Sequence, residues 1–133
     1  MMRALVIRPE HLDNILSRRK TWEIRGSRTT VRGEIGLIAS GSGTVVGVCD
    51  LVGCIGPLTA GEFRKNARKA GLRPGEATLG HYRHTYAWVV DKPKRLRHPV
   101  PYKHPSGAVI WVRLKTAVER RIRRQASPPG RAD

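Results

Sequence analysis

The side chains best suited to chemistry in this sequence lie in one short segment, residues 20–25. The segment reads Lys-Thr-Trp-Glu-Ile-Arg, in which polar and apolar residues alternate strictly. A period of two is typical of a half-buried strand, so we expect Glu23 and Arg25 on one face and the apolar residues in the core. Lys20 would stand at the mouth of this strand. A carboxylate and two cations side by side could bind a phosphate and a base edge, or transfer protons if Lys20 were desolvated.

An alternative interpretation of the same segment is structural. An exposed polar strand face with a surface ion pair would show the same alternation, and such a pair contributes little to stability. The pattern alone leaves the two interpretations equally open.

The charge balance indicates a polyanionic partner. The 133 residues include 26 Lys and Arg but only 10 Asp and Glu, so the formal net charge is +16. Because self-repulsion of this size works against a compact state, we attribute it to binding. Nucleic acid is the first candidate and an anionic membrane surface the second. No stretch approaches the roughly 20 apolar residues of a membrane-spanning helix, and we expect no membrane partner.

Basic residues outside the strand form three groups. One recurs at helical spacing between residues 64 and 69, one crowds a proline-bearing segment over 92–105, and one lies at 120–124. Phosphates are the natural counter-charge, and contacts to them do not depend on base sequence. The residues expected to extend a phosphate-tracking surface are Arg28, Arg32, Lys92 and Lys103.

The elements that must position these residues are strands with a few short helices. Strands are expected over 4–7, 21–25, 34–39, 44–55, 86–90 and 108–114, and helices over 10–19, 60–70 and 115–124. Gly41-Ser42-Gly43 predicts a hairpin turn, and Thr59 predicts a helix cap. Segments 73–83 and 92–105 are expected to be loops. The pattern indicates an α+β fold, a small barrel with short flanking helices.

The sequence also predicts a domain boundary near residue 114 and no metal site at the cysteines. Residues 1–114 are expected to form the domain and 115–133 a basic, partly disordered tail. Cys49 and Cys54 have no second pair to complete a zinc site, and no histidine has ligand spacing with them. We therefore expect no metal, no cofactor, and reduced thiols in a cytoplasmic protein.

Five segments in order resemble the ASCH domain family. They are residues 15–25, 32–35, 46–52, 86–90 and 107–111. The family's pattern is a short helix, then K-x-x-E-x-R, then an R-G-x-(I/L) strand. The spacing of the last segments is similar to that of the ASCH domain of eukaryotic activating signal cointegrators. The resemblance covers residues 4–114.

This resemblance implies a PUA-like β-barrel with a cleft beside it. It also implies binding to nucleic acid, RNA first, with DNA binding attributed to cointegrator-type members. The residues that match the family's cleft pattern are Lys20, Glu23 and Arg25. Alternation from Ile38 adds the Ser40 hydroxyl as a candidate beside the cleft, and a plain strand-end serine is the simpler interpretation.

The resemblance also leaves an enzyme open as an alternative. Some small bacterial members are amidohydrolases acting on N4-acetylcytidine, and others are reported as ribonucleases. The amidohydrolase pattern, K-T-x-T-x-R, has a hydroxyl residue where this sequence has Glu23. In an enzyme, Lys20 would act as base with Glu23 as its acid partner. A third hypothesis is a protein-interaction module whose basic tail contacts an acidic partner.

Overall fold

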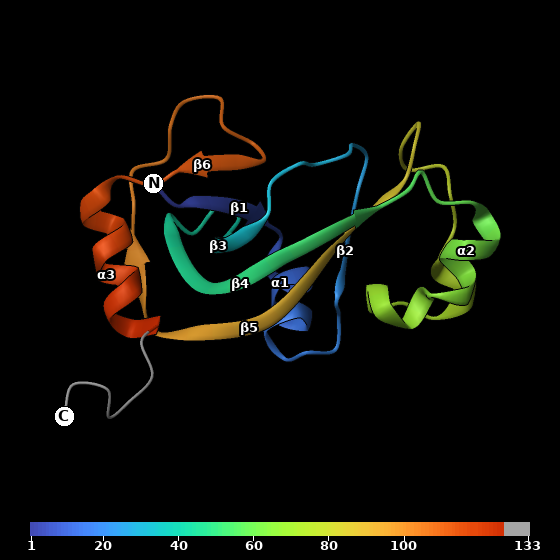
Figure 1. Cartoon of the computed structure of the whole chain (residues 1–133), viewed down its shortest axis with the longest axis horizontal. Coiled ribbons are helices and arrows are strands. Elements are labelled where there is room, and N and C mark those ends of the chain that lie inside the picture. Colours follow the sequence, from blue (N-terminus) through green and yellow to red (C-terminus); the bar gives the residue numbers. More distant parts are fainter. Residues whose placement is uncertain (127–133) are drawn as a thin grey trace.

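The computed structural model describes residues 1–126, which form one six-stranded sheet curled into a half-barrel (Figure 1). The strands are β1 (Arg3–Ile7), β2 (Trp22–Arg25), β3 (Gly33–Ala39), β4 (Thr44–Ile55), β5 (Tyr86–Pro101) and β6 (Trp111–Arg113). Their order in the sheet is β2-β5-β4-β3-β1-β6. β1 and β3 are parallel, and the other neighbours are antiparallel. The expected α+β class is confirmed.

Within residues 1–126, three short α-helices and two 3-10 helices flank the sheet. They are α1 (Pro9–Leu16), α2 (Ala60–Lys65), η1 (Ala67–Ala70), η2 (Pro74–Glu76) and α3 (Thr116–Ala126). α2 and α3 lie at opposite ends of the molecule (Figure 1). No helix in the described part of the chain is long and apolar enough to cross a membrane.

α1 is shorter than the sequence predicts. We expected a helix over 10–19, but α1 ends at Leu16, and Arg18 has a left-handed φ of 67°. The N–H of Lys20 then donates to the carbonyl of Asn14 at 3.0 Å, which turns the chain back toward β2. The residues after Leu16 therefore form the turn that delivers Lys20 to the start of β2.

The second predicted helix begins as expected but breaks in the middle. The Thr59 hydroxyl accepts a hydrogen bond from the Glu62 N–H, and the Glu62 carboxylate accepts one from the Thr59 N–H, which is a capping box. The side-chain amide of Asn66 donates to the Glu62 carbonyl at 2.8 Å. A side chain that bonds to the backbone in this way competes with helical bonding, and the chain continues as η1 up to Gly71.

The expectation of a strand over 86–90 followed by a loop over 92–105 is wrong. β5 runs without interruption to Pro101 and pairs with β4 along its length. The register with β4 shifts around Lys92, whose φ is 49°, and Pro93. A bulge tolerates a residue without an N–H, so the proline does not end the strand.

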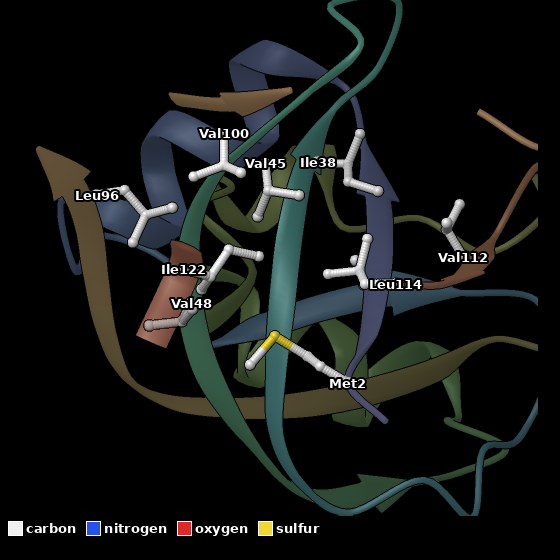
Figure 2. Close-up of a cluster of buried hydrophobic side chains, with 10 residues drawn as sticks. Met2, Ile38, Val45, Val48, Leu96, Val100, Val112, Leu114 and Ile122 are labelled. Carbon is white, nitrogen blue, oxygen red and sulfur yellow. The ribbon is translucent and has the colours of Figure 1, made fainter. Parts of the chain in front are cut away.

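One cluster of buried side chains joins α3 to the sheet. Figure 2 shows Ile122 of α3 beside Val45 and Val48 of β4, with Met2 and Leu114 in the same cluster. Ile122 is fully buried. This part of the expected basic tail is therefore folded against the sheet as a helix. The expected disorder falls on residues 127–133, which lie outside the described residues.

Two further clusters pack the opposite faces of β2 and β5. Trp88 of β5 packs inside the curled sheet with residues such as Leu5 and Leu51. Trp22 of β2 packs on the other face with Phe63 of α2 and is buried, as the sequence predicts. The third cluster therefore holds α2 and η1 against the edge of the sheet that carries the polar residues of β2.

Replacing Ile122 tests the packing of α3. We expect Ile122→Ala to reduce the free energy of unfolding by about 2–5 kcal/mol, because it leaves a cavity in a close-packed cluster. The matched control is Arg121→Ala on the exposed face of the same helix, which should change it by less than about 0.5 kcal/mol. Urea unfolding measures both, and equal effects would show that α3 does not contribute to the core.

Candidate functional site

Lys20, Glu23 and Arg25 form an ion-pair triad centred on one carboxylate. Lys20 Nζ lies 2.9 Å from Glu23 Oε1, and Arg25 Nη2 lies 2.8 Å from Glu23 Oε2. Lys20 and Glu23 are each only 4% exposed. The triad is therefore not an exposed strand face with a surface ion pair. Because one carboxylate faces two cations, the triad carries one excess positive charge.

The edge strand β2 and its neighbour β5 hold Arg25 in place. Glu23 and Arg25 are two residues apart on β2 and share a face, as the alternation predicts, and Arg25 Nε donates to Glu23 Oε2 at 2.9 Å. Arg25 Nη2 also donates to the carbonyl of Val6 at 2.9 Å. The guanidinium carbon lies 5.5 Å from the centre of the Trp88 ring, which stacks on Trp111. Arg25 is thus fixed by β1, β2 and β5 together.

The triad lines a pocket of about 660 Å³. Ser40, a candidate from the sequence for which a plain strand-end serine was the simpler interpretation, is among the residues that line the same pocket. Apolar lining comes from segments far apart in the sequence and includes Val6, Phe63 and Val109. Further polar lining comes from Arg8, His11, Glu76, His81 and Tyr82. The pocket therefore combines an apolar wall with cations, carboxylates and one exposed aromatic ring.

Four other predicted residues do not line this pocket. Arg28 donates to the carbonyl of Gly56 at 3.2 Å, and Arg32 donates to backbone carbonyls of its own turn. Lys92 sits in the β5 bulge and Lys103 is exposed after the end of β5. The structure therefore brings the triad and Ser40 together at one pocket, and the other four predicted residues lie outside it.

Sequence reasoning did not single out two residues that line the pocket, Arg8 and Tyr82. Arg8 directly precedes α1, and Tyr82 lies in the segment before β5. A Cβ on Gly26 would lie 2.5 Å from the Tyr82 ring, so only a glycine after β2 lets the ring lie there. In the sequence, the Gly26-Ser27 pair indicates only the end of a strand. Its contact with the Tyr82 ring depends on the tertiary structure.

The described residues offer no metal centre. No group of three or more His, Cys, Asp or Glu side chains among residues 1–126 could hold a metal ion. Cys49 and Cys54 are both free thiols. Burial raises the pKa of Cys49 to about 12, with Asp50 and other carboxylates adding to the shift, so this thiol stays neutral and unreactive at ordinary pH.

The sequence matches the ASCH domain family over residues 5–100. The fold is similar to a solved structure of ASCH from Zymomonas mobilis, with a TM-score of 0.71, 15% identity, and 92% of this chain and 94% of that chain covered. Two mutant structures of the Zymomonas mobilis protein align with TM-scores of 0.69 and 0.67, each at 16% identity. They cover 92% of this chain and 96% and 94% of theirs. No curated protein matches the sequence.

The triad makes a prediction about stability. We expect Glu23→Gln to reduce the free energy of unfolding by about 3 kcal/mol or more, because it leaves two cations without a counter-charge in a buried site. Lys20→Met should cost less, because Glu23 keeps its partner Arg25. Urea unfolding of both variants gives the comparison, and a larger loss for Lys20→Met would contradict the central role of Glu23.

Proposed function

This chain belongs to the ASCH domain family, and on that premise we propose that it binds single-stranded RNA. One unstacked nucleotide would lie in the pocket lined by the triad, called the nucleotide pocket below. The observation that carries this proposal is the pocket with the buried, net positive triad in its wall. Its volume, about 660 Å³, falls in the range typical of small-molecule sites. Bases in a duplex are stacked and paired, so a pocket for one base favours single strands, loops or ends.

Arg25 supplies a donor that the protein itself does not use. The guanidinium has five N–H donors, and its contacts to Glu23 and Val6 use only Nε and Nη2. Among the described residues Nη1 has no partner, yet no buried side-chain nitrogen or oxygen lacks one. Nη1 is therefore accessible, and it can donate to a phosphate or a base carbonyl.

Tyr82 and Arg8 complete the proposed contacts. Tyr82 is 44% exposed while lining the pocket, so its ring offers a face on which a base can stack. Arg8 is exposed and forms no ion pair among residues 1–126, so it can neutralise a phosphate without breaking a structural contact. The net charge of +16 favours such a polyanionic ligand.

A hydrolase is the second candidate, because Lys20 Nζ and Glu23 Oε1 lie 2.9 Å apart beside the pocket. An amine next to a carboxylate could exchange a proton with a bound RNA, or with a modified nucleoside such as N4-acetylcytidine. Binding is the better supported function because Glu23 is also held by Arg25 through two contacts. The carboxylate therefore serves a positioning role in the protein.

Fluorescence anisotropy with a labelled single-stranded RNA tests the binding proposal. Tyr82→Ala should weaken binding about fivefold or more, because stacking of a base on an aromatic ring contributes about 1–3 kcal/mol. Arg8→Gln should weaken it as well. The matched control, Arg97→Gln, removes an exposed charge on β5 outside the pocket and should have less than a twofold effect.

Two outcomes would contradict the proposal. Unchanged affinity for Tyr82→Ala, with all three variants folded by circular dichroism, would exclude the nucleotide pocket as the RNA site. Shortening of the RNA on a denaturing gel, or loss of the acetyl group from N4-acetylcytidine, would make the site catalytic. If that turnover disappeared in Lys20→Met, the hydrolase would replace the binding module.

A further inference from the structure

A second hollow, called the basic groove below, lies between the turn after α1 and the η1 segment. Its volume is about 690 Å³. Five cations line it, and no Asp or Glu does: Arg18, Arg19, Lys65, Arg68 and Lys69. Two of the five come from the turn after α1, and three come from α2 and η1. A backbone hydrogen bond from the Thr21 N–H to the Lys69 carbonyl, 2.8 Å long, joins the two segments.

The charge of the basic groove is not compensated within the described part of the chain. All five side chains belong to exposed residues, and none forms an ion pair among residues 1–126. Bringing five like charges together costs free energy through mutual repulsion. This contrasts with the triad, where the Glu23 carboxylate offsets one of the two positive charges. An uncompensated concentration of cations in a hollow is the arrangement expected for a ligand with several negative charges.

The basic groove lies next to the nucleotide pocket. Leu72 lines both hollows. Gly71 lines the groove and Lys20 lines the pocket, and a Cβ added at Gly71 would lie only 3.5 Å from Lys20 Cβ. A single layer of residues therefore separates the two hollows.

We propose that the basic groove binds the phosphodiester backbone of the nucleotides that flank the one held in the pocket. This inference rests on the proposed function and adds a second subsite to it. The groove would contact phosphates, so it would contribute affinity and set the direction of the strand without reading bases. Recognition of the base stays with the pocket, where Arg25 Nη1 of the triad would donate to a base carbonyl.

The test compares two triple variants with equal loss of charge. The groove variant is Arg19→Gln/Lys65→Gln/Arg68→Gln, which spares Arg18 at its left-handed φ and Lys69, whose Nζ lies 5.4 Å from the centre of the Trp22 ring. The matched control is Arg120→Gln/Arg121→Gln/Arg124→Gln on exposed positions of α3. α3 lies at the opposite end of the molecule from α2 (Figure 1), so the control removes the same charge far from the groove.

A labelled 12-nucleotide single-stranded RNA is titrated at several salt concentrations. Log affinity falls as log salt concentration rises, and each phosphate contact on a single strand makes this slope steeper by about 0.7. Because the groove variant loses three such contacts, its slope should be shallower than that of the wild type by about 2. At 0.15 M salt its affinity should fall about tenfold or more, while the control keeps the slope of the wild type. Equal effects of the two triple variants would overturn the proposal, because the charge would then act diffusely.

Tyr82→Ala, measured with the same RNA, separates the two proposals. If Tyr82→Ala weakens binding but the groove variant behaves like the control, the basic groove is wrong and the nucleotide pocket stands. If the groove variant weakens binding and Tyr82→Ala does not, the proposed function fails, and the groove is not a subsite beside an occupied pocket.

Binding to vesicles of phosphatidylserine and phosphatidylcholine tests whether the basic groove instead binds an anionic lipid surface. Loss of vesicle binding in the groove variant, with RNA binding intact, would overturn the proposal in favour of a lipid surface.

Discussion

The carboxylate of Glu23 is the contact on which the candidate site depends. It accepts from Lys20 on one oxygen and from Arg25 on the other, within a site where Lys20 and Glu23 are 4% exposed. Removing water from three charges is costly, and only close geometry with full hydrogen bonding offsets that cost. The arrangement requires that the turn after α1, the edge strand β2 and the carbonyl of Val6 in β1 all meet at one place. The triad therefore links the local strand pattern to the curl of the whole sheet.

The two positively charged hollows differ in how their charge is held. In the nucleotide pocket, the cations of the triad are paired, so they are rigid and present few donors, one of which is the accessible Nη1 of Arg25. In the basic groove, the cations are exposed and unpaired among the described residues, so they suit contacts that need charge more than geometry. A base edge needs fixed donors, whereas a phosphate backbone tolerates mobile ones. The difference in burial between the two sets of cations is what supports the two proposed roles.

Packing around the site comes from elements that are far apart in the sequence. Cluster contacts between Trp22 and Phe63 fasten α2 to β2, and the Thr21–Lys69 backbone bond fastens η1 next to it. At the other end, Ile122 anchors α3 on the sheet (Figure 2). Shortening the chain to residue 114 would therefore remove a buried side chain as well as charges. Point substitutions of exposed arginines separate charge from folding, which a truncation does not.

Local sequence determined several features by itself. Alternation over 20–25 predicted that Glu23 and Arg25 share a face, Thr59 predicted a helix start, and the order of motifs predicted the family. Such features depend on residues that are close together in the sequence, because strand periodicity and helix capping are local properties. The sequence also predicted Trp22 in the core, because the apolar face of a half-buried strand must be covered.

Tertiary structure alone decided the rest. Lys92 and Pro93 resemble a loop locally, but pairing with β4 carries β5 through them to Pro101. Arg8 and Tyr82 reach the nucleotide pocket from separate segments, and nothing in either segment indicates the other. These positions depend on strand pairing and on contacts between residues distant in the sequence. Sheet register and side-chain packing decide such contacts only when the whole chain has folded.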